Sequence, residues 1–226
     1  SPNIIFADAE NLEEAAKVST MGIFRNSGEV CVAGSRLLVE DKIHNEFLKL
    51  VSEYSQKLKI GDPLEIKNDV GAINSLSQLQ SDLDFVEKAK SEGGNIEIGG
   101  NRILKSSGGF YMEPTIISSV KQDTEVFQNE VFGPILTVTA FSNEDEAIKL
   151  ANGTDFGLAS GIWTSNLSRA HKMVKKIKAG TVFVNTYGGS DNTIPLTGVK
   201  QSGNGSDKSL HALDKFTDLK SVWMKL

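Results

Sequence analysis

Apolar residues repeat at two spacings along this chain, and the two alternate from one segment to the next. Apolar residues three or four apart predict amphipathic helices, whereas short apolar runs rich in β-branched residues predict buried strands. Asn11-Leu12-Glu13-Glu14 is typical of a helix start, with a carboxylate three residues after the cap. Helices are predicted from this cap toward Met21 and over residues 43–58, 76–89, 144–150, 167–177 and 207–216; strands are predicted over residues 35–40, 95–98, 110–118, 135–141, 159–163, 181–185 and 219–223.

This order of elements predicts the fold class. Strands that alternate with helices of about ten or more residues imply a mostly parallel, twisted sheet flanked by helices on both faces. No internal repeat or linker divides the chain. We therefore predict one α/β domain over residues 1–217, followed by a short C-terminal arm, itself a strand, over residues 218–226.

Composition and charge exclude several classes of protein. The chain has 226 residues and a net charge of −5, which argues against a nucleic-acid binder that depends on a basic face. It lacks the run of about 18 apolar residues that a transmembrane helix needs, and its first residues are unlike a signal peptide. With a single cysteine, Cys31, it forms no internal disulfide or cysteine-based zinc site. We therefore expect a cytoplasmic protein with no membrane or nucleic-acid partner.

Cys31 is the first candidate for chemistry. It falls in a loop between a predicted helix and a predicted strand, with glycines at positions 28 and 34. A thiolate is a strong nucleophile, and loop N–H groups can stabilise charge that develops beside it. A lone cysteine is more often a small buried hydrophobe, however, so the local context by itself favours a structural role.

Glu130 is the second candidate. It opens the segment Glu-Val-Phe-Gly-Pro at residues 130–134, directly before a predicted buried strand. A carboxylate at a sheet end can accept hydrogen bonds from a sugar diol or act as a base. Glutamate is also the usual choice for a solvated loop, and that interpretation stays open at this point.

The three histidines leave a further alternative open. His44, His171 and His211 all fall on helical patterns among charged residues, where surface positions are expected. Their spacing does not exclude a hydrolase that pairs one of them with Cys31. No sequence pattern supports a metal site, because the chain has neither a His-Glu-x-x-His motif nor cysteine–histidine pairs.

Two segments taken together resemble the signature sequences of the NAD(P)-dependent aldehyde dehydrogenases. They are Phe-Arg-Asn-Ser-Gly-Glu-Val-Cys at residues 24–31 and Glu-Val-Phe-Gly-Pro at residues 130–134. Residues 1–5, 152–158 and 198–203 are also similar to family segments, so the resemblance covers essentially the whole chain. Residues 202–217 look most like the γ-glutamyl-γ-aminobutyraldehyde dehydrogenases of putrescine breakdown.

The resemblance implies a mechanism and a set of cofactor contacts. Cys31 attacks a small aldehyde as a thiolate, and its own N–H together with a distant asparagine amide holds the oxyanion. Hydride passes to NAD or NADP, and water hydrolyses the thioester to a carboxylic acid. Glu130 holds the ribose hydroxyls beside the nicotinamide, Phe132 packs near the nicotinamide, and Gln78 stands where the family often has another ribose contact.

The resemblance also assigns substrate contacts and shows departures from the family pattern. Val30 and Val32 flank the nucleophile and are expected to line the aldehyde tunnel, and Leu196 stands where an aromatic side chain commonly shapes that pocket. Ser81 replaces a frequent lysine near Gln78. Glu29 replaces a frequent glutamine, and its charge raises the pKa of a nearby thiol unless the side chain points away.

The family places its nucleotide-binding domain, its oxyanion asparagine and its general-base glutamate before the segment that matches residues 1–5. The resemblance therefore implies a catalytic domain that is inactive as a dehydrogenase by itself, with the nucleotide-binding domain absent and upstream of residue 1. The C-terminal arm of the family pairs with a neighbouring subunit, so we expect a homo-oligomer. The alternative from another class is a non-catalytic assembly module.

Overall fold

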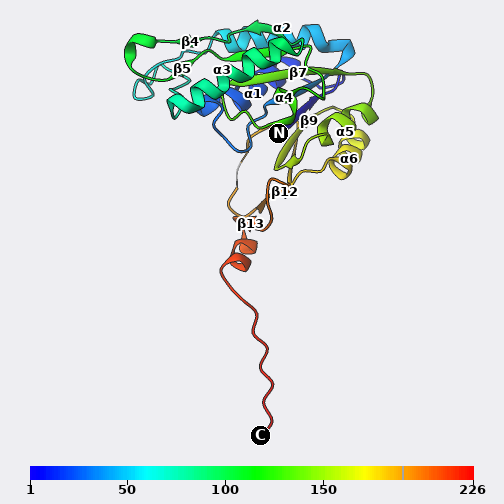
Figure 1. Cartoon of the computed structure of the whole chain (residues 1–226). Helices are drawn as coiled ribbons and strands as arrows, with labels where there is room; N and C mark the ends of the chain where they lie inside the picture. Colours follow the sequence, from blue (N-terminus) through cyan, green and yellow to red (C-terminus); the bar gives the residue numbers. More distant parts are fainter. Residues whose placement is uncertain (190) are drawn as a thin grey trace.

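The computed structural model describes residues 1–189 and 191–226 (Figure 1). Its main sheet has seven strands in the order β10-β9-β1-β2-β7-β6-β3. Within the described residues, every neighbouring pair of this sheet is parallel except β3 with β6. The prediction of a mostly parallel α/β sheet is therefore confirmed. The strands are β1 (Pro2–Ile5), β2 (Arg36–Glu40), β3 (Asn95–Ile98), β6 (Thr115–Ser118), β7 (Ile135–Phe141), β9 (Ala159–Trp163) and β10 (Thr181–Val184).

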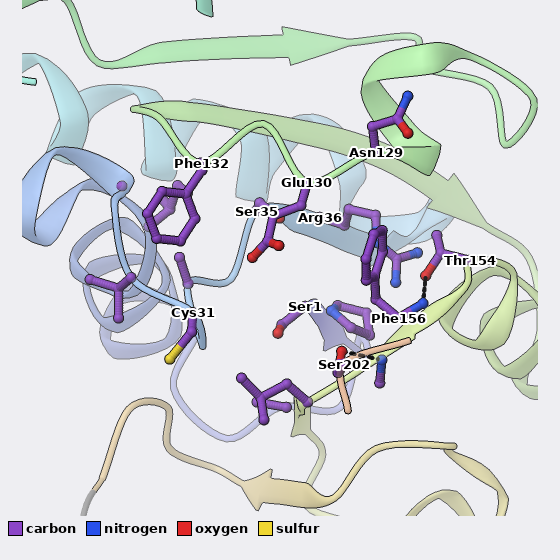
Figure 2. Close-up of a pocket in the computed structure, with 18 of the residues that line it drawn as sticks. Ser1, Cys31, Ser35, Arg36, Asn129, Glu130, Phe132, Thr154, Phe156 and Ser202 are labelled. Atoms are coloured by element: carbon purple, nitrogen blue, oxygen red, sulfur yellow. Dashed lines mark hydrogen bonds between the residues drawn. The ribbon is translucent and has the colours of Figure 1, made fainter. Parts of the chain in front are cut away.

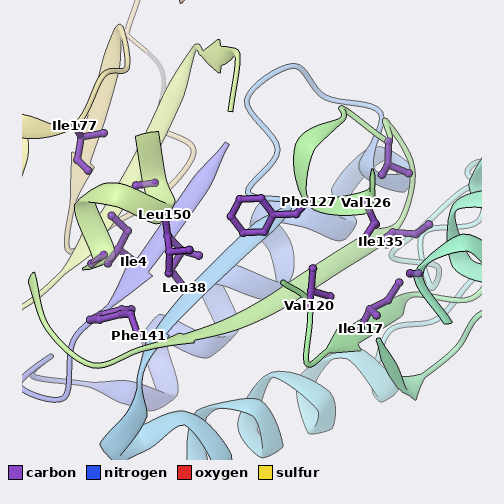
Figure 3. Packing of buried hydrophobic residues seen from close by; sticks show 14 of the residues in the cluster. Ile4, Leu38, Ile117, Val120, Val126, Phe127, Ile135, Phe141, Leu150 and Ile177 are labelled. Atoms are coloured by element: carbon purple, nitrogen blue, oxygen red, sulfur yellow. The ribbon is translucent and has the colours of Figure 1, made fainter. Parts of the chain in front are cut away.

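The central strands are buried on both faces. Ile4 and Ile5 of β1 follow each other in sequence and belong to different hydrophobic clusters, and so do Leu37 and Leu38 of β2. Successive side chains of a strand point to opposite faces, so a strand covered on both sides has apolar residues at consecutive positions. Figure 3 shows the cluster that contains Ile4 and Leu38.

Helices cover the two faces in separate groups. Buried residues of α1 and α2 pack with Ile5 and Leu37, whereas buried residues of α3 to α6 pack with Ile4 and Leu38. The first helix begins where predicted, because the Asn11 side chain accepts a hydrogen bond from the Glu14 N–H at 2.9 Å. The helices are α1 (Leu12–Phe24), α2 (His44–Gln56), α3 (Leu76–Ser91), α4 (Glu125–Gln128), α5 (Glu144–Asn152) and α6 (Leu167–Lys176).

One predicted strand is split in two. Residues 110–118 form β5 (Tyr111–Met112) and β6, and Pro114 lies between them. Proline has no N–H to donate to a strand ladder, and the two halves pair with different partners. β5 pairs with β4, whereas β6 pairs with β7. The remaining short strands are β4 (Arg102–Ile103), β8 (Phe156–Gly157), β11 (Leu196–Thr197), β12 (Val199–Lys200) and β13 (Ser206–Asp207).

The C-terminal residues differ from the prediction. The helix expected over residues 207–216 is reduced to a 3₁₀ helix, Leu210–Lys215, and its apolar side chains are exposed rather than packed in a core that would stabilise a longer helix. The strand expected at residues 219–223 does not form, and this segment extends away from the body of the molecule (Figure 1). Leu219 and Trp223 are 106% and 99% exposed. A strand needs a neighbour for its N–H and C=O groups, and no described residue pairs with this one.

Candidate active site

A cavity of about 250 Å³ lies at the amino ends of four parallel strands. The segments that line it directly precede or begin β1, β2, β7 and β9, so the parallel sheet brings them to one edge. Figure 2 shows Cys31, Glu130 and Phe132 around this space. The lining residues are Ser1, Pro2, Ile23, Gly28, Val30, Cys31, Ala33, Ser35, Arg36, Phe127, Gln128, Asn129, Glu130, Phe132, Gly133, Thr154, Phe156, Gly157, Leu158, Ala159, Gln201 and Ser202.

Cys31 lies at the tip of a tight turn. The Ala33 N–H donates to the Val30 carbonyl at 2.9 Å, which closes the turn around Cys31. Cys31 itself is exposed, so its thiol is open to the cavity rather than buried in the core. Within the part of the chain that the structure describes, the Cys31 N–H has no hydrogen-bond acceptor. A free thiol and a free N–H on one residue can attack a carbonyl carbon and stabilise the oxygen that becomes charged.

The backbone before Cys31 is held in an uncommon conformation. Asn26 and Ser27 both have positive φ, 53° and 57°, which turns the chain sharply after α1. Each is stabilised by its own side chain: Asn26 Nδ2 donates to the Glu29 carbonyl at 3.0 Å, and Ser27 Oγ donates to the Gly71 carbonyl at 2.9 Å. These polar bonds fix the path of the loop from Phe24 to Cys31.

Two glycines bring the Cys31 loop against the Glu130 segment. Gly28 has φ of +76°, and a Cβ added to it would lie 2.1 Å from the Gly133 carbonyl oxygen. A Cβ on Gly133 would in turn lie 2.2 Å from Oδ2 of Asp82 on α3. The loop and the segment are therefore in backbone contact, and the segment packs directly on the Asp82 side chain of α3, which only residues without a Cβ permit.

Glu130 and Phe132 both present side chains to the cavity. Glu130 is exposed, and Phe132 is 40% exposed with a positive φ of 63°. A left-handed conformation is uncommon for an aromatic residue and here turns the chain just before β7. An exposed carboxylate beside an aromatic ring offers hydrogen-bond acceptors and a flat apolar face to the same ligand.

Gln78 does not line the cavity. Its Nε2 donates to Asp82 Oδ1 at 2.8 Å and to the Val131 carbonyl at 2.9 Å, so the amide links α3 to the Glu130 segment. Asp82 is fully buried, and its other oxygen has no partner among the described residues. Burial raises the pKa of Asp82 to about 7, while the hydrogen bond from Gln78 lowers it and the charge of Glu29 raises it.

Of the remaining predicted site residues, only some line the cavity. Val30 lines the cavity, whereas Val32 and Leu196 do not, and the assigned roles of all three stay predictions. The Glu29 carboxylate accepts the Asn74 N–H at 3.0 Å, which ties this charge to the start of α3. None of the three histidines lines the cavity.

Arg36 is a cavity residue that the sequence analysis missed. It begins β2, is buried, and donates to the carbonyls of Leu150 and Ala151 at 3.0 and 3.1 Å. Its guanidinium also lies over the Phe127 ring at 4.8 Å. Burial lowers the pKa of Arg36 to about 10, so the side chain stays charged at neutral pH. An arginine directly before the apolar run Leu37-Leu38-Val39 was the signal that could have identified it.

The described residues contain neither a metal-binding cluster nor a membrane-spanning helix. No group of three or more His, Cys, Asp or Glu side chains there is placed to hold a metal ion. No helix in that part of the chain is both long and apolar enough to span a bilayer.

Comparisons with known proteins agree with this geometry. Residues 1–222 match the aldehyde dehydrogenase family. The NADP/NAD-dependent aldehyde dehydrogenase PuuC of Escherichia coli K12 is 44% identical over 226 residues, which is 100% of this chain and 45% of that protein. The chain thus spans less than half the length of this relative.

Solved structures give the same result. An indole-3-acetaldehyde dehydrogenase in complex with NAD⁺ superposes with a TM-score of 0.97 at 48% identity, over 100% of this chain and 46% of that one. A γ-glutamyl-γ-aminobutyraldehyde dehydrogenase from Burkholderia cenocepacia J2315 has a TM-score of 0.94 at 44% identity, over 97% and 44%. The family match and these superpositions, together with the exposed Cys31 and the Glu130 segment on one cavity, lead to one conclusion: the chain belongs to the aldehyde dehydrogenase family.

Proposed function

We propose that this chain carries the nucleophile-bearing half of an NAD(P)-dependent aldehyde dehydrogenase, which oxidises an aldehyde to a carboxylic acid. One observation carries the proposal. Cys31, the single cysteine of the chain, is exposed on a tight turn at a cavity that it shares with Glu130. A cysteine with only a packing role is normally buried.

Cys31 performs the covalent step. Its thiolate forms a bond to the aldehyde carbon, and the electron pair of the carbonyl moves onto oxygen. The N–H of Cys31 has no internal acceptor among the described residues and donates to that oxygen. After oxidation the acyl group is held on the sulfur as a thioester, which water hydrolyses to the acid and the free thiol.

The residues at the cavity fit a nicotinamide ribose. Glu130 is an exposed carboxylate, and a carboxylate accepts hydrogen bonds from the two hydroxyls of a ribose. Phe132, 40% exposed in the same cavity, offers a ring face near the nicotinamide end. A bound nicotinamide supplies the acceptor for the hydride. Gln78 supports this site through the Val131 carbonyl, and its own contact to the second ribose remains part of the proposal.

The substrate and cofactor preferences are proposed from the relatives. PuuC carries both cofactors in its name, and one superposed structure is a γ-glutamyl-γ-aminobutyraldehyde dehydrogenase. We therefore propose NAD or NADP as cofactor and an aldehyde of the γ-glutamyl-amino type as substrate. Val30, Val32 and Leu196 are proposed to contact that aldehyde. A reducing, cytoplasmic setting suits an enzyme whose nucleophile is an exposed thiol.

The relatives are about twice as long as this chain, so we propose that the catalytic and nucleotide-binding functions lie in separate domains. Residues 1–217 are proposed as the catalytic domain, and the main nucleotide-binding site is proposed to lie in a domain outside this chain. Hydride transfer needs both parts, so the 226-residue chain is expected to lack dehydrogenase activity while it keeps thiol chemistry at Cys31.

The experiment separates thiol chemistry from dehydrogenase activity. The chain is first mixed with 4-nitrophenyl acetate: it is expected to release 4-nitrophenolate faster than a short cysteine peptide does, and Cys31→Ala is expected to release none above buffer. The chain is then extended at its start by the residues that its gene encodes there, and reduction of NAD⁺ by aldehydes is followed by absorbance. Dehydrogenase activity that survives Cys31→Ala, or robust activity of the 226-residue chain alone, would contradict the proposal.

The geometry gives the alternatives less support. A hydrolase of the Cys–His type needs a histidine beside the thiol, and none of the three histidines lines the cavity. A module without catalytic activity has no need of an exposed cysteine with a free N–H.

The C-terminal arm, residues 218–226, is proposed to pair with a second copy of the chain. Its apolar side chains are almost fully exposed, and an unpaired extended segment offers its whole backbone to a sheet edge. Deleting the arm is expected to lower the mass in solution, measured by light scattering, to that of one chain. Replacing Lys220 and Lys225 with serine, which leaves the apolar side chains in place, serves as the control. An unchanged mass after the deletion would rule out this role.

A further inference from the structure

Tyr187 contacts the turn that carries Cys31, although the two residues are far apart in sequence. Its hydroxyl donates to the carbonyl of Val32 at 2.8 Å. Val32 directly follows Cys31, and Tyr187 follows β10 near the other end of the domain. Tyr187 is only 8% exposed and does not line the cavity, so it contacts the Cys31 turn from the interior of the domain.

The Tyr187 ring packs against three glycines. Gly22 of α1, Gly34 of the Cys31 loop and Gly161 of β9 surround it, and a Cβ on these residues would lie 3.1, 3.2 and 2.6 Å from the nearest ring atom. The Phe183 ring packs on it with centroids 5.3 Å apart. With so little free space, the ring has one position and its hydroxyl has one direction.

The hydrogen bond from Tyr187 adds a contact from a distant segment to a turn that backbone hydrogen bonds close. The Ala33 N–H bonds to the Val30 carbonyl inside the turn, and the Gly34 N–H bonds to the Gly22 carbonyl at 3.0 Å just after it. The Val32 carbonyl is the group between these two bonds, and Tyr187 is its donor. Burial raises the pKa of Tyr187 above its ordinary value, so the hydroxyl keeps its proton across the pH range in which a thiol ionises.

We propose that Tyr187 is a positioning residue for the nucleophile: by holding the Val32 carbonyl it orients the turn so that the Cys31 N–H faces the oxyanion. This inference rests on the proposed function, in which that N–H stabilises the tetrahedral adduct. It differs from a purely structural role, because it concerns the direction of one N–H group rather than the stability of the domain.

Two reactions at Cys31 distinguish these roles. With 4-nitrophenyl acetate, the thiolate forms an S–C bond, the carbonyl oxygen becomes an oxyanion, and the C–O bond then breaks to release 4-nitrophenolate. With iodoacetamide, the thiolate displaces iodide in a single step without an oxyanion. Tyr187→Phe keeps the ring and removes the hydroxyl that donates to Val32, so it is expected to slow acylation about tenfold and to leave the alkylation rate and its pH profile unchanged.

Tyr54→Phe is the matched control, since Tyr54 is a half-buried residue of α2 that does not line the cavity; both of its rates are expected to equal those of the unmodified chain. Placing 4-aminophenylalanine at position 187 restores an N–H donor and is expected to recover most of the lost acylation rate. If Tyr187→Phe does not fold, Gly34→Ala provides a second route, because its Cβ would push on the ring atom that bears the hydroxyl. This variant is expected to show the same split between the two rates.

The measured rates distinguish a failure of the positioning role from a failure of the proposed function. Equal acylation rates for Tyr187→Phe and the unmodified chain, or an equal fall in both reactions, overturns the positioning role and leaves the function standing. If the unmodified chain is acylated no faster than a short cysteine peptide at the same pH, the proposed function fails, and with it the need for a positioned N–H.

Discussion

Gly28→Ala is expected to destabilise the chain by about 3 kcal/mol and to part the Cys31 loop from the Glu130 segment. Gly28 has φ of +76°, a conformation that costs an alanine roughly 1 kcal/mol. Its Cβ would also lie 2.1 Å from the Gly133 carbonyl oxygen, which belongs to the backbone and has no rotamer to change. Overpacking of this kind adds roughly 1–3 kcal/mol. Urea unfolding measures the loss of stability, and acylation of Cys31 reports the damage to the site.

Gly108→Ala separates the two causes. Gly108 has φ of +79°, nearly that of Gly28, but no atom lies within 4 Å of the position that its Cβ would take. This variant is therefore expected to show the conformational cost alone, roughly 1 kcal/mol, with an unchanged acylation rate. Equal losses of stability in the two variants would mean that the close approach of Gly28 to Gly133 adds nothing to the destabilisation by Gly28→Ala.

Asp82→Asn is expected to stabilise the chain, and to stabilise it more at pH 8 than at pH 5. Asp82 is fully buried, one of its oxygens has no partner among the described residues, and burial raises its pKa to about 7. The folded state then binds the proton more tightly than the unfolded state, so the free energy of unfolding falls as pH rises from about 4 to about 7. An asparagine resembles the protonated acid and keeps an oxygen that accepts from Gln78.

The magnitude follows from the size of the pKa shift. One pKa unit corresponds to about 1.4 kcal/mol, so the advantage of Asp82→Asn over the unmodified chain is expected to grow by roughly 3 kcal/mol between pH 5 and pH 8. Urea unfolding at the two pH values gives this difference. Glu29 is the charged neighbour that raises the pKa of Asp82, so Glu29→Gln is expected to reduce the pH dependence of the unmodified Asp82.

Asp84→Asn is the matched control on the same helix. Asp84 accepts from Gln80 four residues earlier, as Asp82 does from Gln78, but its side chain is exposed. Water solvates the exposed carboxylate, so Asp84→Asn measures the effect of the substitution on this helix without the cost of burial. If the two variants have the same pH dependence, burial is not what controls the protonation of Asp82.

The pattern of apolar residues was sufficient for most of the fold. A central strand buried on both faces needs consecutive apolar residues, and such runs exist at Ile4-Ile5-Phe6 and at Leu37-Leu38-Val39. Local chemistry also determined the first helix start, because the Asn11 cap depends only on residues three positions apart. The prediction of a C-terminal strand was wrong, because local preference does not supply a pairing partner. Its residues favour a strand, but no described residue pairs with them.

Recognition of the two signature segments identified the family, but not how their residues are used. No local pattern predicts that Gln78 donates to the Val131 carbonyl, because this contact joins α3 to a segment more than fifty residues away. The cavity also lies at the amino ends of the strands, whereas ligands in open α/β sheets more often bind at the carboxyl ends.

The sequence by itself determined most strands and helices before residue 190 and the presence of a single thiol, since these depend on spacing and residue type along the chain. Only the tertiary structure decided that Cys31 is exposed, that Gly28 touches Gly133, and that Tyr187 holds the Val32 carbonyl. The reason is physical: burial and hydrogen bonding between distant residues depend on how the elements pack, and side chains with the same local preference end in a core or in a cavity according to that packing.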